Sequence, residues 1–154
     1  MGIDARLQTL GIELPIAPKP VGNYVGAVRT GNLLFMSGCG PRLPDGTSIT
    51  GKLGDTMQVE QGYEAARLVG LNMLANIKAQ LGSLDRVEQV VKVLGMVNCA
   101  ADFADHPKVI NGFSDLFVEV FGEAIGRGAR SAVGMAALPG QIAVEVEIIL
   151  QVRD

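Results

Sequence analysis

The chain has 154 residues, of which 48% are hydrophobic and 19% charged, and this balance is typical of one globular domain with an extensive core. Its net charge of -3 argues against a nucleic-acid surface, because such surfaces cluster Lys and Arg against phosphates. The two cysteines lie far apart, which excludes a disulfide framework and favours a reducing compartment. No signal peptide or membrane-length apolar run occurs, so we expect a soluble cytoplasmic protein with no membrane partner.

Residues 1–154 are predicted to form one domain, with residues 1–23 as an N-terminal extension packed on it. A short helix is expected from Asp4 to Leu10, and the three prolines that follow require an extended or irregular chain. Strand-like runs at residues 24–29 and 33–37 flank a Gly-containing turn and predict a hairpin. A short third strand is expected within residues 48–53.

Two amphipathic helices follow, separated by a strand. Residues 59–81 place apolar side chains at helical spacing, with Asp55 or Thr56 as the expected N-cap. Residues 87–97 form a nearly continuous apolar run that is typical of a central strand. The second helix is expected to begin after Asp105, and its apolar positions also share one face.

The last quarter of the chain reads as two strands, residues 131–138 and 144–149, joined by a turn at Pro139 and Gly140. Alternation along the second strand places Glu145 and Glu147 on one face. If the two strands pair, Arg130 lies near these carboxylates, where it could hold an acidic substrate while a carboxylate activates water. The alternative is an exposed sheet face with an ordinary ion pair, and spacing alone favours that second interpretation.

Two helices for five or six strands predict an α+β fold, in which a mixed sheet of about six strands carries both helices on one face. The opposite face must also be covered, which a dimer or trimer would achieve. Other kinds of site have little support. His106 is the only imidazole, at an expected helix start on the surface, so metal binding and Ser-His or Cys-His catalysis are disfavoured. Tyr24 and Asn111 remain as polar candidates, although either could be an ordinary strand-edge or helix-surface residue.

From Tyr24 to its C-terminus the chain resembles the YjgF/RidA family of enamine/imine deaminases. The most specific segment is Ala129-Arg130-Ser131-x-Val133, followed by Leu138-Pro139 and Val144-Glu145-Val146-Glu147. Further support comes from Tyr24-Val25, Gly31-Asn32, Ser37-Gly38 and Val109-Ile110-Asn111. The longer Pro-containing N-terminus is typical of a side branch.

This resemblance implies a chorismate-mutase-like fold and a homotrimer with active sites in clefts between subunits, without cofactor or metal. It implies hydrolysis of reactive 2-imino or enamine acids to 2-keto acids and ammonia. It assigns Arg130 to the substrate carboxylate, Glu145 to the attacking water and the backbone of Ala132 to the imine. Tyr24 and Asn111 match positions that line the cleft.

The chain departs from the family pattern at two positions. Ala132 replaces a common Cys, and Cys39-Gly40-Pro41 replaces a more usual Gln-x-Pro, so Cys39 alters the wall of the cleft. Two other functions stay open: a non-catalytic trimer that binds small carboxylates, and a ribonuclease or translation inhibitor. The acidic charge and the lack of a basic or aromatic track disfavour the ribonuclease.

Overall fold

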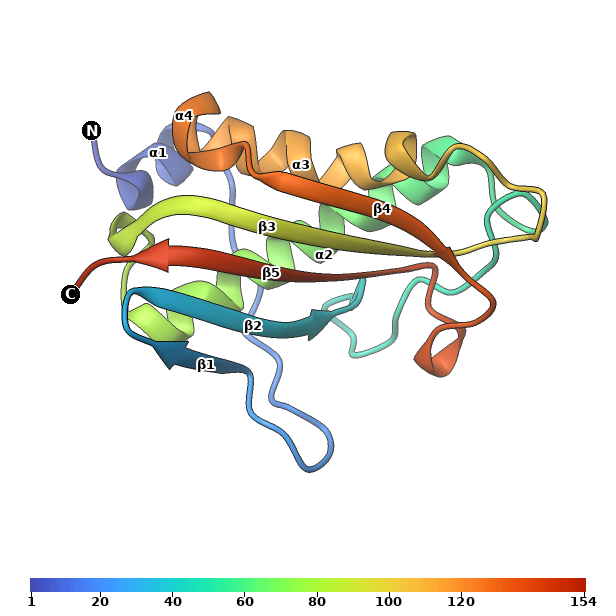
Figure 1. Cartoon of the computed structure of the whole chain (residues 1–154), viewed down its shortest axis with the longest axis horizontal. Coiled ribbons are helices and arrows are strands. Elements are labelled where there is room, and N and C mark those ends of the chain that lie inside the picture. Colours follow the sequence, from blue (N-terminus) through green and yellow to red (C-terminus); the bar gives the residue numbers. More distant parts are fainter.

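A five-stranded mixed sheet forms one layer of the molecule in the computed structural model, which describes residues 1–154 (Figure 1). The strand order is β1-β2-β5-β3-β4, and only β3 and β4 run parallel. The strands are β1 (Ala27–Thr30), β2 (Leu33–Cys39), β3 (Val87–Asn98), β4 (Ala129–Met135) and β5 (Val144–Val152). The expected mixed α+β architecture is thereby confirmed.

The sheet has five strands instead of about six, because residues 48–53 do not form one. This segment makes only isolated bridges, such as Thr50 with Ile142 and Leu53 with Cys99. Gly51, at a φ of +141°, interrupts its extended conformation. The hairpin of β1 and β2 is present, but Tyr24 lies in the loop before it.

The prediction that the last two strands could pair is wrong, because β3 lies between β4 and β5. Helices α3 (His106–Phe121) and α4 (Glu123–Gly126) provide the crossover that a parallel β3–β4 pair requires. The 3-10 turn Pro139–Gln141 then leads β5 to the centre of the sheet. There the apolar face of β5 is fully buried beneath the helices.

The two long helices, α2 (Val59–Leu81) and α3, pack on one face of the sheet, as expected (Figure 1). The N-terminus of α2 is closed by a capping box of Gln58 and Gln61, not by the expected Asp55 or Thr56. The helices approach closely at Gly112, where an added Cβ would lie 2.0 Å from the carbonyl oxygen of Tyr63. Gly112 therefore permits the close spacing of α2 and α3.

The opposite face of the sheet is only partly covered. Phe35 is 41% exposed there, in a depression that also includes Val28, Leu94 and Ile149. Apolar residues thus occupy a solvent-facing sheet surface within one chain.

The N-terminal segment combines a docked helix with a loosely held irregular stretch. Helix α1 (Ile3–Thr9) buries Leu7, and the backbone N–H of Ile3 donates to Asp85. By contrast, residues 13–24 make one hydrogen bond, from the Val21 N–H to the Tyr24 hydroxyl at 3.4 Å. No helix of the molecule is both long enough and apolar enough to span a bilayer.

Candidate functional site

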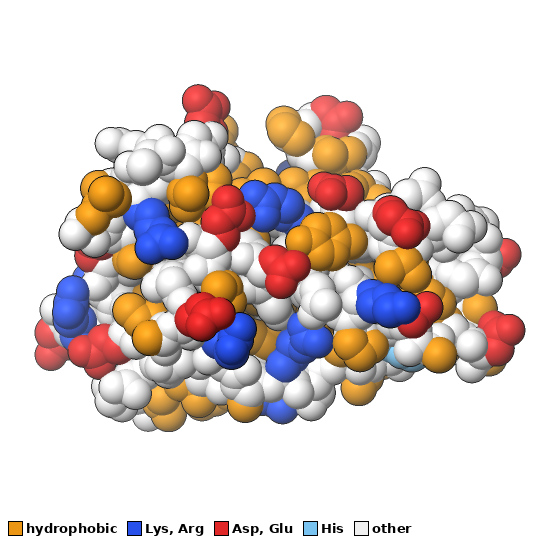
Figure 2. All heavy atoms as spheres, turned by 90° about the horizontal axis from the view of Figure 1, so that it is seen from above, with side chains coloured by type: hydrophobic (Ala, Val, Ile, Leu, Met, Phe, Trp, Pro, Cys, Tyr) orange, Lys and Arg blue, Asp and Glu red, His pale blue; other side chains and the backbone are white.

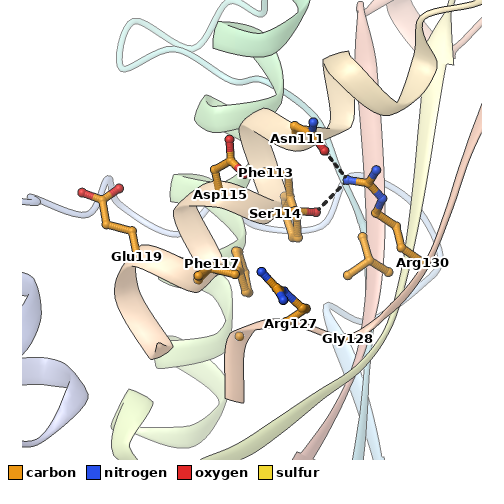
Figure 3. Close-up of a pocket in the computed structure, with 12 residues that line it drawn as sticks. Asn111, Phe113, Ser114, Asp115, Phe117, Glu119, Arg127, Gly128 and Arg130 are labelled. Atoms are coloured by element: carbon orange, nitrogen blue, oxygen red, sulfur yellow. Dashed lines mark hydrogen bonds between the residues drawn. The ribbon is translucent and has the colours of Figure 1, made fainter. Parts of the chain in front are cut away.

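Arg130 lies on the edge strand β4 and projects toward the helix layer. It pairs with Val93 in the register of β3 and β4, and Val93 belongs to the buried core. Its Nη1 donates to Asn111 Oδ1 at 2.8 Å and to Ser114 Oγ at 3.2 Å (Figure 3). Both partners are neutral, and Arg130 takes part in none of the five ion pairs. The guanidinium is therefore oriented but not neutralised, and its other N–H groups can bind an anion.

A cavity of about 540 Å³ opens beside this guanidinium, between α3 and the segment that precedes β4 (Figure 3). We call it the Arg130 cavity; its polar lining includes Asn111, Ser114, Arg127 and Arg130. Two carboxylates also line it, but Asp115 accepts from the Tyr63 hydroxyl and Glu119 pairs with Arg67. Ala132 lies two residues further along the same face of β4, opposite Gly95, and does not line the cavity. Asn111 therefore meets Arg130 as the sequence suggested, whereas Ala132 stands apart from them in a single chain.

Glu145 lies on the central strand β5 and projects from the opposite face of the sheet. Its side chain is half-buried and makes no hydrogen bond. Burial raises the pKa of its carboxyl group, and the negative charge of Glu147 raises it further. Gly38 leaves the space for this carboxyl group, since an added Cβ would lie 3.0 Å from Glu145 Cδ. Glu145 is thus a carboxylate with increased proton affinity.

A second cavity, of about 300 Å³, is lined by Glu145 together with Tyr24 and Cys39, and we call it the Glu145 cavity. Asn76 Nδ2 donates to the Cys39 sulfur at 3.8 Å. Burial, followed by the charge of Glu145, raises the pKa of the Cys39 thiol to about 12. Cys39 therefore contributes a neutral thiol to the wall and no nucleophile.

The predicted site residues consequently fall into two separate groups. Arg130 and Asn111 line one cavity, and Glu145, Tyr24 and Cys39 line the other. Arg130 and Glu145 project from opposite faces of the sheet, with β3 between their strands. A single chain does not bring the arginine and the glutamate to one substrate.

Two residues that contact these groups, Ser114 and Asn76, were not among the candidates predicted from the sequence. Ser114 follows Asn111 by three positions on α3, and this spacing places both on one helix face. Asn76 contacts Cys39 from α2, and no spacing in the sequence indicates it. His106 is half-buried instead of exposed, with its Nε2 3.4 Å from the Cys99 sulfur. No three His, Cys, Asp or Glu side chains converge as metal ligands.

The mixed sheet with two long helices on one face has the architecture of the chorismate-mutase-like α+β proteins. The family model described as "YjgF/chorismate_mutase-like, putative endoribonuclease" matches residues 4–148. The chain therefore belongs to the YjgF/RidA family.

Similar proteins include Protein TCP17 of Trypanosoma cruzi, 44% identical over 99% of this chain and 95% of its own length. A "2-iminobutanoate/2-iminopropanoate deaminase" of Dermatophagoides farinae is 31% identical over 92% of this chain and 95% of its own. A "putative endoribonuclease" structure from Shewanella oneidensis has a TM-score of 0.92 and 34% identity, covering 99% of this chain and all of that one. E. coli TdcF with bound serine has a TM-score of 0.63 and 27% identity, covering 92% and 97%.

Proposed function

We propose that the protein hydrolyses reactive 2-imino and enamine acids to 2-keto acids and ammonia, without a cofactor, at sites between the subunits of a homotrimer. The observation that carries this proposal is the guanidinium of Arg130, which faces a cavity with only neutral partners. The similarity to the Dermatophagoides deaminase supports it.

Arg130 binds the carboxylate that every 2-imino acid carries. A guanidinium forms two parallel hydrogen bonds with a carboxylate, and the neutral oxygens of Asn111 and Ser114 orient it without competing for its charge. This fixes the position of the adjacent C=N carbon. Positioning of this kind supplies much of the acceleration of a two-reactant step.

Glu145 acts on the water. Its carboxylate accepts a proton from the water while the water oxygen bonds to the C=N carbon, and the resulting carboxyl group passes this proton to the imine nitrogen to give a carbinolamine. The same carboxylate then transfers the hydroxyl proton to the amino group, so that the C–N bond breaks, ammonia leaves, and a carbonyl group remains. The raised pKa of Glu145 strengthens it as a base for this transfer. The backbone of Ala132 is assigned to the imine, with Tyr24 and Cys39 in the wall.

The two cavities meet only if a second copy of the chain supplies one of them. The outer edge of β4 is unpaired, and the open sheet face is partly apolar. Both features favour association through this side of the molecule. In the proposed trimer, the Arg130 cavity of one subunit faces the Glu145 cavity of its neighbour.

A second candidate is a trimer that binds small carboxylates without turning them over, and it is favoured by the serine bound to TdcF. A ribonuclease has less support. Figure 2 shows acidic and basic side chains interspersed over one face of the molecule, with no continuous basic track.

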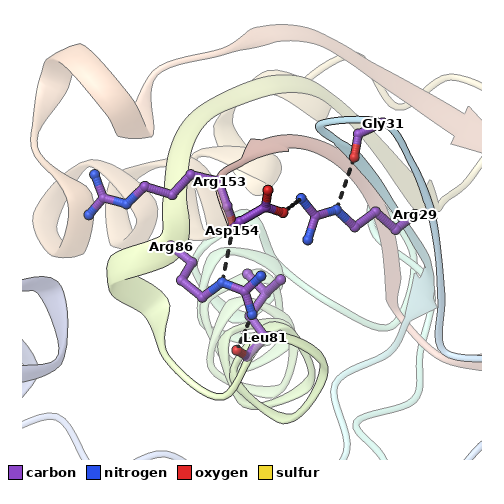
Figure 4. A network of polar contacts seen from close by, with 6 residues as sticks. All are labelled: Arg29, Gly31, Leu81, Arg86, Arg153 and Asp154. Atoms are coloured by element: carbon purple, nitrogen blue, oxygen red, sulfur yellow. Dashed lines mark hydrogen bonds and ion pairs between the residues drawn. The ribbon is translucent and has the colours of Figure 1, made fainter.

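The test is the decay of an imino acid that an amino acid oxidase generates in the assay. We expect the wild-type protein to accelerate hydrolysis, and Arg130→Ala and Glu145→Gln to abolish that acceleration. Arg29→Ala is the matched control, because Arg29 forms an exposed ion pair with Asp154 that lies in neither cavity (Figure 4). Carboxylate binding without acceleration of any imine would support the binding trimer instead.

Sedimentation tests the assembly separately. A trimer has a mass of about 49 kDa, three times the 16.2 kDa of one chain. A monomer at assay concentration would contradict a site shared between subunits.

A further inference from the structure

The mouth of the Glu145 cavity is crossed by a segment of the N-terminal extension. Residues 17–21, which we call the strap, line this cavity and also an adjoining cavity of about 700 Å³. Apart from the bond between Val21 and Tyr24, no hydrogen bond holds the strap. It therefore acts as a wall of the cavity and contributes little to the core.

Two cationic side chains lie on this wall. Lys19 of the strap and Arg42 of the loop after β2 line both cavities, and both are exposed. Neither forms an ion pair with any carboxylate of the chain. The nearby Asp45 is instead engaged by the backbone and hydroxyl of Thr47, at 2.9 and 2.6 Å.

Two prolines restrict the backbone around Lys19. Pro18 and Pro20 restrict the backbone on either side, which lowers the entropy lost when the segment is ordered. The remaining polar lining of the Glu145 cavity includes the neutral side chains of Asn76 and Gln80. Its only carboxylate is Glu145, so the mouth carries an excess of positive charge.

We propose that Lys19 and Arg42 select substrates with a second anionic group, that is, 2-imino acids whose side chain ends in a carboxylate. This inference rests on the proposed function, in which Arg130 already binds the first carboxylate and Glu145 serves the water. A second carboxylate must then lie on the far wall of the site, and the two cations meet it there. Neutral 2-imino acids lack that contact.

The experiment compares imines generated from glutamate with imines generated from leucine. Exposed ion pairs are each worth about 0.2–1 kcal/mol, so loss of both cations corresponds to a fall of about 2- to 30-fold in kcat/KM. We expect this fall in kcat/KM for the acidic imine in Lys19→Ala/Arg42→Ala. The value for the leucine imine should change by less than about twofold, because that imine has no second carboxylate to pair with the cations. Added salt weakens the wild-type preference because both cations are exposed.

Two control variants separate charge from structure. Lys19→Arg keeps the charge and is expected to retain the preference. Lys108→Ala removes an exposed lysine of α3 that lines neither the Glu145 cavity nor the adjoining cavity, and it is expected to leave both rates unchanged. An equal loss on both imines in the double variant would overturn the inference, as would a wild-type protein with no preference for the acidic imine.

Binding measurements test the selection by Lys19 and Arg42 separately from catalysis. If the wild-type protein hydrolyses no imine, calorimetry with 2-ketoglutarate and pyruvate replaces the rate assay. Tighter binding of the dicarboxylate, lost in Lys19→Ala/Arg42→Ala, would support the selection without catalysis. Equal binding of the two acids, or an unchanged preference in the double variant, would refute it.

Discussion

Mixing two inactive variants tests whether the site is shared between subunits. Arg130→Ala lacks the carboxylate anchor and Glu145→Ala lacks the base, so each homotrimer is expected to be inactive. Because the two side chains project from opposite faces of one sheet, their partners at a shared site belong to different chains. A mixed trimer therefore contains interfaces at which one variant supplies its intact Arg130 and the other its intact Glu145.

The expected recovery follows from counting interfaces. In an equal mixture that assembles at random, half of the chains carry an intact Arg130 and half an intact Glu145. An interface needs the first on one side and the second on the other, so about one quarter of the sites are complete in a cyclic trimer. An unselected mixture is thus expected to reach about one quarter of the wild-type activity per chain. Mixed trimers separated from both homotrimers are expected to reach about one third, because one of their three sites is complete.

The assay requires that the chains exchange. The two variants are co-expressed with different tags, purified over both, and assayed for imine decay beside each homotrimer. Recovery well above the single variants supports the shared site. Mixed trimers of normal mass that stay inactive would refute it, because active sites formed within one chain cannot be repaired by mixing.

Three further outcomes follow from the packing and charge of particular residues. Gly112→Ala is expected to lower the free energy of unfolding by about 1–3 kcal/mol, and Tm by about 2–4 °C per kcal/mol, because the added Cβ meets backbone atoms. Gly70→Ala is the control and should leave Tm nearly unchanged, because its Cβ is crowded only by the end of a leucine side chain. The raised pKa of Glu145 means that the folded state binds its proton more tightly than the unfolded state, so the stability of the wild-type protein falls as pH rises above about 4.3. Thermal melts should therefore show Glu145→Gln more stable than the wild type near neutral pH and equally stable below that value. Iodoacetamide near neutral pH should label Cys99 before Cys39, whose pKa is about 12, and peptide mass spectrometry that found Cys39 labelled first would contradict its assignment as a neutral wall residue.

The helices and strands that depend on local hydrophobic patterns were predicted from the sequence. Helical spacing at residues 59–81 matches α2, and the apolar run at residues 87–97 matches β3 to within one residue. The expected strand at residues 48–53 is not formed because Gly51 interrupts the extended conformation, which leaves only isolated bridges.

The arrangement of the site could not be predicted in the same way. Two consecutive strands joined by a Pro-Gly turn are typical of a hairpin, yet β5 enters the sheet between β2 and β3. Strand order depends on long-range pairing, which spacing along the chain does not encode. Arg130 and Glu145 were thus predicted correctly to lie on strands. The prediction that these strands are adjacent was wrong, because β3 lies between β4 and β5.

The separation of Arg130 from Glu145 has a chemical consequence. Opposite charges about 4 Å apart attract by about 4 kcal/mol near a protein surface, so an adjacent pair would neutralise each other. The arginine would then bind substrate weakly, and the pKa of the glutamate would fall instead of rising. On opposite faces of the sheet, Arg130 keeps neutral partners and Glu145 keeps a raised pKa. In the proposed trimer the two groups approach each other only across a cleft that substrate and water can fill, so each retains the property that its role requires.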